Sequence, residues 1–563
     1  MVNFFKKNDF LKLYLKIYQK LNIMKHSHQI KTFLISIFFL IIYNTSFSQL
    51  LINGAAFIID SGAIVTVQGD LISNTNIQGS GKIIMSGGAT QNINMGGFGL
   101  PTLEINNGQN VNLLSDVRIE KGLNFTLGKI QSSSFNLTLS TAAITIGAAD
   151  SKFVEMTGSG QVYKELSADV NNYEMPIGAG SIYRPAYISS SATTYDNAKI
   201  GIKAIAIANP NKPIHCADYL STYWPVTRSG ITGTVSVSGQ YADATDIVGA
   251  ESNLRGYFYD GTDWSSANGS NDAVANKIGA PVLGTGGTIY GMSKMLLVGA
   301  RAFLQGAYNS TTGLMTDAIR TVLPASDPYR NAPYNTAFNH VNNSTPETIE
   351  GTPFITQSIV ANNIVDWVFL ELRNTNASPG NTILQTRSAL IQRDGDIVDV
   401  DGVSPVTFSN LPDGNYGITV RHRNHLSMSL SPTLGSVALS EKKSTAFTTN
   451  VADLRTALPS SIYGTTAGFT TASHPTLTTV NLLWGGNANS NGNSKYSGAT
   501  NDRAVILSDL SNNELGTLSG YNRSDINLNG IVKYSGAGND RSFLLSSVLL
   551  NNELGFRTEQ KPN

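Results

Sequence analysis

Residues 64–85 read IVTVQGDLISNTNIQGSGKIIM, and this stretch is the clearest guide to the fold. Short apolar runs alternate with turns that contain Gly, Asn or Ser, and the alternation continues across residues 50–150. Short strands that recur roughly every eight to twelve residues are typical of all-β chains. One such turn cannot bury its apolar face alone, whereas stacked turns share a continuous core. We therefore predict a β-solenoid-like domain over residues 49–150, with a β-sandwich as the alternative.

The chain changes character after this point. Over residues 151–301 the apolar runs lengthen and aromatic residues gather, as in Tyr223-Trp224-Pro225-Val226, and Asp260-Gly261 is a hairpin-turn dipeptide. These features predict a β-sandwich domain over residues 151–301. The aromatic residues could form a sugar-stacking platform, although aromatic side chains more often lie in a core.

A further domain is expected over residues 302–450. Residues 366–373 are apolar on both faces of a strand, and Tyr416 follows a turn from which its hydroxyl would make a corner hydrogen bond. We predict an immunoglobulin-like β-sandwich here. Residues 451–484 are rich in Thr, Ser, Gly and Ala, and we predict a linker that leads to a small module at residues 485–563. The predicted fold class is mainly all-β.

The N-terminal residues predict export. The apolar run at residues 33–43 follows lysines and is too short to span a bilayer as a free helix, and small residues at 46–48 suit cleavage before Gln49. We interpret residues 1–48 as an N-terminal extension and signal peptide, with Met24 as the favoured start and an amphipathic anchor helix as the alternative. No later stretch predicts a transmembrane helix. We expect a secreted protein or one on the outer cell surface.

Charge and cysteine content exclude several classes of protein. The chain has 563 residues with 39 Lys+Arg and 39 Asp+Glu. Residues 1–48 hold seven of the basic and one of the acidic residues, which leaves 32 basic and 38 acidic residues and a net charge of −6. This excess of acid argues against nucleic-acid binding, which needs a basic face. Cys216 is the single cysteine, so an intramolecular disulfide framework is excluded.

A tandem duplication near the C-terminus is the most specific chemical signal. Residues 487–503 read NANSNGNSKYSGATNDR and residues 525–541 read DINLNGIVKYSGAGNDR, at an offset of 38 residues. Each copy leads into an apolar run and then into Asn-Asn-Glu-Leu-Gly, at 512–516 and at 551–555. Hard cations such as Ca²⁺ take roughly six to eight oxygen ligands from loops that turn sharply. We therefore predict two calcium loops, which we call loop one (487–503) and loop two (525–541).

Loop two matches the first half of the EF-hand pattern, with Gly530 at the sharp turn. With Asp525 counted as position 1, position 12 of the EF-hand pattern should be an acid, but here it is Gly536. We therefore predict an inserted turn that brings in a later carboxylate. Arg541 could instead pair with that carboxylate. The predicted ligands are Asp525, Asn527, Asn529, the backbone carbonyl of Ile531, and Asp540.

Loop one carries fewer charges, and calcium affinity falls with ligand charge, so we expect loop two to bind more tightly. The alternative is that both loops are Asx-rich turns without metal, in which Asp502 and Asp540 simply cap short helices. The predicted ligands of loop one are Asn487, Asn489, Asn491 and Asp502.

The other polar clusters favour structural roles. His215 and Cys216 are neighbours and would point to opposite faces of a strand, which argues against a nucleophile pair. The spacing of His422 and His425 would likewise separate them on a strand and argues against a zinc pair. An acidic hairpin is more simply a solvated turn than a cation site, and it contains Asp396, Asp399 and Asp401. No complete catalytic motif occurs in the sequence.

Two family resemblances follow from these motifs. The loops resemble dockerin-like calcium repeats, which place two such loops before two short helices, over about residues 482–550. The mature chain resembles secreted hemagglutinin-type surface proteins of the Bacteroidetes, which implies adhesion. The motifs that carry this second resemblance are Tyr183-Arg184-Pro185, Tyr223-Trp224-Pro225-Val226, residues 303–308, Asp366-Trp367-Val368, Glu371-Leu372-Arg373, residues 393–396, residues 421–426 and the Lys-Tyr-x-Gly-x-x-Asn-Asp-Arg loops.

We expect a non-enzymatic adhesin or surface scaffold that binds cell-surface glycans or another extracellular protein, with Ca²⁺ ordering its C-terminal repeats. The first alternative is a component of an extracellular polysaccharide-degrading assembly, docked by its dockerin-like end. The second is a glycan-cleaving enzyme on the solenoid, which would need a pair of carboxylates flanking the scissile bond. The acids available there are Asp60, Asp70, Glu104, Asp116, Glu120 and Asp150.

Overall fold

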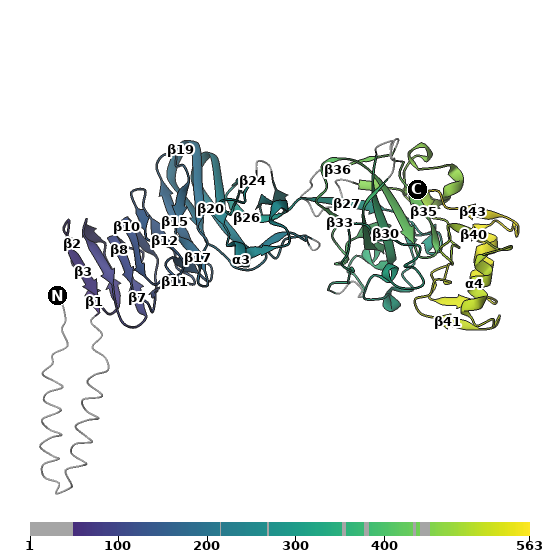
Figure 1. Ribbon diagram of the computed structural model, residues 1–563, viewed down its shortest axis with the longest axis horizontal. Coiled ribbons are helices and arrows are strands. Elements are labelled where there is room, and N and C mark those ends of the chain that lie inside the picture. The colour runs from purple at the N-terminus through teal and green to yellow at the C-terminus, as the bar shows by residue number, and fades with distance from the viewer. Residues whose placement is uncertain are drawn as a thin grey trace, which may run out of the picture. The chain divides into compact units, whose positions relative to one another are not determined.

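The computed structural model describes residues 49–213, 216–266, 269–351, 356–375, 382–431, 435–439 and 451–562, and the predicted signal peptide lies outside them. Strands make up 47% of the chain and helices 8%, so the mainly-β prediction is confirmed. The described residues divide into two compact units, residues 49–210 with 218–292 and residues 211–217 with 293–562. Strands build both of them (Figure 1).

The first unit begins as a β-solenoid-like stack of about 6 turns, as predicted. One row of parallel strands contains β1 (Leu50–Ile52), β4 (Leu71–Ser73), β7 (Gln91–Asn94), β9 (Val111–Leu113), β11 (Ile130–Ser132), β14 (Val154–Met156) and β17 (Ile177–Ala179). A second row contains β3 (Ile64–Val67), β6 (Lys82–Met85), β8 (Gly99–Asn106), β10 (Val117–Leu127), β12 (Leu137–Leu139) and β15 (Val162–Leu166). The short strands β2 (Phe57–Ile59) and β5 (Ile77–Gly79) pair separately, and β13 (Ile144–Ile146) pairs with β10.

In-register stacking builds the solenoid core. Ile83, Leu103 and Leu123 occupy matching positions on β6, β8 and β10, and each is 0% exposed. Neighbouring residues on these strands point outward, since side chains alternate between the faces of a strand. The apolar residues of successive turns therefore form one column, which no single turn could bury by itself.

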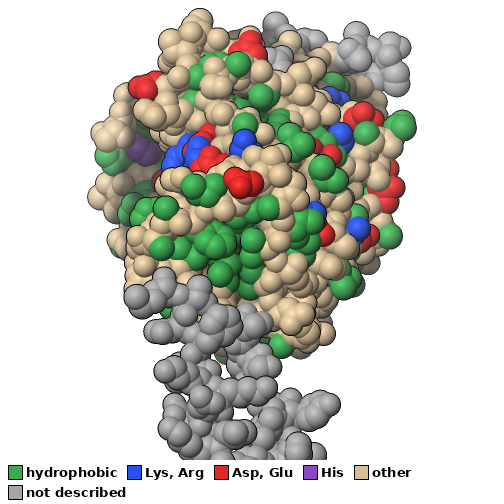
Figure 2. Space-filling view, turned by 90° about the vertical axis from the view of Figure 1, so that its left-hand side faces the viewer, with side chains coloured by type: hydrophobic (Ala, Val, Ile, Leu, Met, Phe, Trp, Pro, Cys, Tyr) green, Lys and Arg blue, Asp and Glu red, His purple; other side chains and the backbone are tan. Residues whose placement is uncertain are grey.

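The first turn of the solenoid carries apolar side chains that remain accessible. Leu51, Ile58 and Ile64 lie on β1, β2 and β3 and are 49%, 60% and 57% exposed. Figure 2 shows the molecule from the side on which the N-terminal strands lie in Figure 1, and apolar side chains gather in the middle of that face.

The parallel rows continue past residue 150, where we had placed a domain boundary. Ile130 on β11 pairs with Val154 on β14, and the second row then turns antiparallel at β15. The sheet continues through β19 (Ala186–Ile202), β20 (Tyr219–Gln240), β26 (Gly286–Ser293), β22 (Leu254–Tyr259) and β23 (Trp264–Ser265). Residues 151–210 and 218–292 therefore share one compact unit with the solenoid.

Smaller elements complete this unit. They are β16 (Tyr173–Met175), β18 (Ile182–Tyr183), α3 (Asp243–Asp246), β21 (Ile247–Val248), η1 (Glu251–Asn253), β24 (Ser270–Asp272) and β25 (Lys277–Pro281). The aromatic residues Trp224, Tyr257 and Trp264 are buried, so the core interpretation of this aromatic set holds for them.

A nine-stranded sheet forms the body of the second unit. Its order is β33 (Val406–Ser409), β27 (Met295–Arg301), β32 (Asp396–Val398), β31 (Ile383–Gln392), β30 (Ile364–Asn374), β34 (Gly414–His422) and β35 (His425–Ser429), with β36 (Val437–Leu439) on β34 and β37 (Val451–Asp453) on β27. Strand β30 is buried on both faces, as its sequence predicts. The hydroxyl of Tyr416 donates to the carbonyl oxygen of Pro412 at 2.5 Å, which is the predicted corner bond.

Residues 451–484, which we expected to be a linker, belong to this body. They contain β37, η5 (Pro459–Ser461), η6 (Thr466–Gly468) and the hairpin of β38 (Thr470–His474) and β39 (Thr478–Leu482). Val480, Leu482 and Leu483 lie in the same hydrophobic core as β30. The Thr-rich composition reflects exposed strand faces rather than a solvated connection, because Thr is also a good strand former. Short elements between the strands are β28 (Tyr308–Asn309), β29 (Leu314–Met315), η2 (Arg320–Val322), η3 (Pro328–Arg330) and η4 (Val360–Asn362).

The two loops form a module in which each copy completes the other. Loop one contributes β40 (Asn493–Lys495) and α4 (Asp502–Asp509), and its tail is β41 (Thr517–Ser519). Loop two contributes β42 (Ile531–Lys533) and α5 (Asp540–Ser542), with its tail at β43 (Phe556–Thr558). Strand β40 pairs with β43 and β41 pairs with β42, so each loop is closed by the tail of the other copy (yellow in Figure 1).

One inserted residue distinguishes the two copies. The loops are offset by 38 residues, but the Asn-Asn-Glu-Leu-Gly tails at 512–516 and 551–555 are offset by 39. The second helix absorbs the extra residue as η7 (Phe543–Val548), a π-helix, whereas α4 is an α-helix. A π-turn accommodates one additional residue without breaking the helix. Ile506 of α4 and Leu544 of η7 thus still reach one shared core.

Candidate metal centre

Asparagine rather than aspartate caps the two short helices. Asn539 accepts a hydrogen bond of 2.7 Å from the amide of Ser542, and Asn501 accepts one of 2.8 Å from the amide of Ala504. An Asx side chain at this position satisfies a free amide of the first helical turn. Asp502 and Asp540 are therefore the first helical residues and not the caps, which contradicts the alternative in which these acids cap the helices.

The freed carboxylate of Asp540 turns back onto loop two. Its Oδ1 accepts from the backbone amides of Ile526 at 2.9 Å and Asn527 at 3.4 Å. Its Oδ2 accepts from the backbone amide of Lys533 at 2.9 Å. The late carboxylate thus reaches the loop, as the inserted turn requires. Arg541, the competing partner, lies instead over the ring of Tyr534 at 4.7 Å.

The early residues of loop two form nested turns around the same point. Asp525 accepts from the amides of Asn529 at 3.1 Å and Gly530 at 2.9 Å. Asn527 Oδ1 accepts from Asn529 at 3.1 Å, and Asn529 Oδ1 accepts from the amide of Ile531 at 2.9 Å. Gly530 has φ +89°, the left-handed region that glycine adopts without strain. Ile531 enters this network through its amide.

Loop one repeats most of this network. Asn487 Oδ1 accepts from the backbone amide of Gly492 at 3.2 Å, and Asn489 Oδ1 accepts from the backbone amide of Asn491 at 3.1 Å. Asn491 Oδ1 accepts from Asn493 at 2.9 Å. Asp502 accepts from the amide of Lys495 at 2.8 Å and from that of Asn489 at 3.4 Å. All four predicted side chains of loop one are therefore gathered at one point.

The sequence did not reveal one further oxygen in each loop. The carbonyl of Gly538 accepts from the side-chain amides of Asn527 at 3.0 Å and Asn529 at 3.1 Å. In loop one the carbonyl of Thr500 accepts from Asn489 and Asn491 at 2.8 Å and 3.3 Å. Thr500 and Gly538 have φ of +55° and +65°. The glycine at one of two equivalent positions was the available signal, since a left-handed residue can turn its carbonyl inward.

Burial sets the electrostatics of the loops. Asp502, Asp525 and Asp540 are each 0% exposed, and no ion pair of the described residues involves them. Burial raises the pKa of Asp502 and of Asp540 to about 7, and the charge of Asp525 adds to the shift of Asp540. Burial also raises the pKa of Asp525, partly offset by Arg423. Loop two therefore concentrates two buried acids, neither of which forms an ion pair with a described residue, although the charge of Arg423 acts on Asp525.

The donor set of loop two fits a hard cation. Asp525 accepts two backbone hydrogen bonds and Asp540 accepts three. A carboxylate has about four lone-pair sites, so roughly three sites remain free on the two acids. Amide and carbonyl oxygens of Asn527, Asn529 and Gly538 lie in the same network. Oxygen ligands of these kinds suit Ca²⁺ and Mg²⁺ rather than the softer metals.

A hairpin of the sheet holds both loops at their first residue. The turn between β34 and β35 contains Asn424, which is fully buried. Its carbonyl accepts from the amide of Asn487 at 3.1 Å, and its side-chain amide donates to the carbonyl of Asp525 at 2.8 Å. Arg423, beside it, donates to the carbonyl of Asn522. One asparagine therefore fixes the first predicted ligand of each loop, Asn487 in loop one and Asp525 in loop two.

The same hairpin corrects our expectation for the two histidines. His422 and His425 are cross-strand partners, because the chain turns between them, and their Nδ1 atoms lie 3.1 Å apart. His425 Nε2 accepts from the amide of Gly306 at 3.0 Å, and His422 Nε2 lies 2.9 Å from Asp366. Both rings are thus engaged by the protein, so they form a buried relay and not an open metal site.

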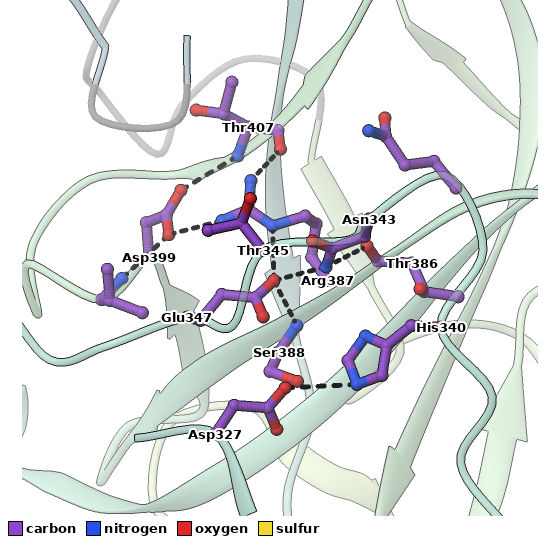
Figure 3. A network of polar contacts seen from close by, with 12 residues as sticks. Asp327, His340, Asn343, Thr345, Glu347, Thr386, Arg387, Ser388, Asp399 and Thr407 are labelled. Atoms are coloured by element: carbon purple, nitrogen blue, oxygen red, sulfur yellow. Dashed lines mark hydrogen bonds and ion pairs between the residues drawn. The ribbon is translucent and has the colours of Figure 1, made fainter. Parts of the chain in front are cut away.

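A separate cluster of metal-binding residue types lies in the same unit (Figure 3). Asp327, His340 and Glu347 bring their ligand atoms within 4.8 Å of one another. Arg387 Nε lies 2.9 Å from Glu347, and Arg330 lies 3.2 Å from Asp327. These two guanidinium groups already balance the carboxylates and would repel a divalent cation. We interpret this cluster as a buried ion-pair network.

The acidic hairpin also has protein partners. Asp399 is fully buried and lies 3.2 Å from Arg387, which overturns the solvated turn for that residue. Asp396 pairs with Arg301 at 2.5 Å, and Asp401 accepts from Ser404 at 2.6 Å. Cation binding is therefore not needed to explain this hairpin.

No protein-family model matches the chain, and neither a curated protein nor a solved structure shows significant similarity to it. The chemistry of the chain's own residues therefore carries the functional argument. Of the helices in the described ranges, none combines the length and the apolar character needed to cross a bilayer.

Proposed function

We propose that loop two binds Ca²⁺, that loop one is a second and weaker site, and that calcium orders the C-terminal module. The observation that carries the proposal is the burial of Asp525 and Asp540 in one loop, where neither forms an ion pair with any residue that the structure describes. Two buried carboxylates in such proximity must take up a proton or a cation. A divalent ion would satisfy both at neutral pH.

The ligand types favour a hard cation such as calcium over zinc and copper. The loops offer carboxylate, amide and carbonyl oxygens and contain no His or Cys, so they lack the ligands that zinc and copper prefer. Loop one has a single carboxylate, Asp502, because Asn487 replaces the first acid. The lower charge predicts weaker binding at loop one, in the range of extracellular calcium modules.

We further propose that the protein is an extracellular, non-enzymatic adhesin or surface scaffold for glycans or another extracellular protein. The predicted signal peptide, the resemblance to hemagglutinin-type surface proteins and the lack of catalytic motifs in the sequence support this proposal. Among the carboxylates considered for a solenoid glycosidase, Glu104 is paired with Lys82 at 2.6 Å and Glu120 with Arg118. The hydrogen bond from Lys82 lowers the pKa of Glu104, which does not suit a general acid.

Adhesion is tested with residues 49–563 as a purified protein. We expect erythrocyte agglutination or glycan-array binding that depends on calcium. Absence of both, with no partner recovered from cell-surface extracts, would contradict adhesion. The calcium proposal is tested separately, because a thermal midpoint that responds neither to calcium nor to chelator would contradict it alone.

A second candidate function is a component of an extracellular polysaccharide-degrading assembly, docked through the C-terminal module. The observation in its favour is a pair of exposed apolar residues at equivalent positions of the two copies, Leu515 at 87% and Leu554 at 86% exposed. The duplication thus presents the same exposed leucine twice, as two apolar side chains that a partner could cover. Retention of a cohesin-like partner by the wild-type chain, and its loss in Leu515→Ser/Leu554→Ser, would favour this function over adhesion.

A further inference from the structure

A cavity of about 660 Å³ lies beside loop two. Asn527 and Asn529 form one side of it, and the segment of Tyr308, Asn309 and Ser310 forms another. Asn309, Ser310 and Asn529 are exposed, so the cavity is open to solvent. Its volume lies within the roughly 300–1,000 Å³ of small-ligand sites.

A glycine fixes the cavity against the loop. Gly306 packs so closely on loop two that a Cβ there would lie 2.2 Å from the carbonyl oxygen of Ile526. The amide of Gly306 also donates to His425 at 3.0 Å, which anchors this segment to the β34–β35 hairpin. The two walls of the cavity therefore keep a defined spacing, because both are tied to the same hairpin.

The lining of the cavity points to a neutral, polyhydroxylated ligand. None of its lining residues carries a charge, so an anion or a cation would find no charged side chain there. Amides and hydroxyls dominate the wall, with the rings of Tyr308 and Phe543 among them. Such groups exchange hydrogen bonds with hydroxyls, and aromatic side chains offer an apolar body to the CH groups of a sugar. A purely apolar ligand would leave the wall amides without partners.

The cavity shares four residues with loop two, which are Asn527, Asn529, Gly538 and Asn539. Asn527 and Asn529 belong to the hydrogen-bond network of Asp525 and Asp540 and also line the cavity. Calcium takes roughly six to eight oxygens and accepts ligands of flexible geometry. Asp525 and Asp540 are buried behind this wall, so a ligand in the cavity would meet an ion in loop two at Asn527 and Asn529.

We propose that this cavity binds a neutral sugar and that two neighbouring sugar hydroxyls complete the coordination of the ion in loop two. The inference rests on the proposed calcium site, and it names the ligand class that the adhesin would recognise. The recognition is calcium-dependent, since the ion supplies part of the site.

The test uses the whole mature chain, residues 49–563, and the methyl glycosides of mannose, galactose, glucose and fucose. Saturation-transfer NMR is recorded with calcium and again with chelator. Ser310→Trp fills the cavity from the segment opposite loop two, and Thr311→Trp is the matched control, since residue 311 is not part of the lining. Calcium titration and thermal unfolding of each variant show whether the fold and the metal site are intact.

We expect at least one glycoside to bind in calcium, to be released by chelator, and to bind at least tenfold more weakly to Ser310→Trp but normally to Thr311→Trp. Normal calcium binding without any glycoside signal would overturn the sugar site and leave the calcium proposal standing. Glycoside binding that persists in chelator would overturn the coordination by the ion. An equal loss in both Trp variants, with both folded, would overturn the placement in this cavity.

Discussion

The side-chain amide of Asn424 donates to the carbonyl oxygen of Asp525 at 2.8 Å, and the carbonyl of Asn424 accepts from the amide of Asn487. One residue of the sheet therefore holds position 1 of both loops, although it lies far from them in the sequence. The sheet and the loop module are thus joined at the point where each predicted ion would be bound.

Replacing Asn424 with Ala is expected to destabilise the protein and to weaken calcium binding together. The carbonyls of Arg523 and Asp525 would lose their donor inside the protein, and each buried unpaired group costs about 1–3 kcal/mol. Chemical unfolding and calcium titration measure the two effects. The exposed Asn335→Ala is the control, and equal behaviour of the two variants would contradict the role of the hairpin.

The effect of Asp540→Asn on the thermal midpoint is expected to have opposite signs without and with calcium. Without calcium at pH 8, the substitution should raise the thermal midpoint, because it removes a buried charge that lacks a cationic partner. In saturating calcium it should lower the midpoint, since it removes a charged ligand, and binding at a hundredfold excess over Kd is worth about 2.7 kcal/mol. Asp502→Asn, at the equivalent position, should behave likewise with a smaller calcium effect. A loss of stability that is the same with and without calcium would indicate a purely structural carboxylate.

Gly306→Ala is expected to disturb loop two. The added methyl group would lie 2.2 Å from the backbone of Ile526, which has no flexible atoms to give way. Overpacking of this kind costs about 1–3 kcal/mol. Gly414→Ala is the matched control, because the nearest atom to a Cβ there is 3.7 Å away. Unfolding free energies of the two variants decide the point, and a tolerated Gly306→Ala would show that the segment and the loop are not in close contact.

The histidine relay predicts loss of stability in mild acid. Burial lowers the pKa of His422 and lowers that of His425 well below its usual value, with Asp366 opposing the shift at His422. A His with a lowered pKa contributes stability that is present above its unfolded pKa of about 6.5 and is lost as pH falls below it. The thermal midpoint should therefore fall between pH 7 and pH 5 by more in the wild type than in His425→Gln, which keeps an acceptor for Gly306. Parallel pH profiles would contradict this assignment.

The parts that sequence could predict are those in which the deciding residues are close in the chain. The stacked turns of residues 50–150 are visible because each turn is a local unit, and loop two is visible because its first ligands lie within a few residues. The offset of 38 residues between the copies further identifies Asp502 and Asp540 as equivalent. The structure then places both carboxylates on their loops.

The features that were missed depend on contacts between distant residues. Composition alone gave a linker at residues 451–484, whereas Val480 and Leu483 are buried against strands far along the chain. Strand spacing separated His422 from His425, but a turn between them brings the rings together. The carbonyl of Gly538 was missed because every residue carries the same group, and the glycine at this position was its one local signal.

Calcium titration of residues 49–563 by isothermal calorimetry tests the central claim most directly. We expect one tighter and one weaker binding event, with the tighter one lost in Asp525→Asn and the weaker one lost in Asp502→Asn. Equal calcium affinities of the two loops would still support binding but would contradict the predicted order of their affinities. No heat of binding, together with a thermal midpoint that is unchanged by calcium and by chelator, would contradict the claim that these loops hold a divalent ion.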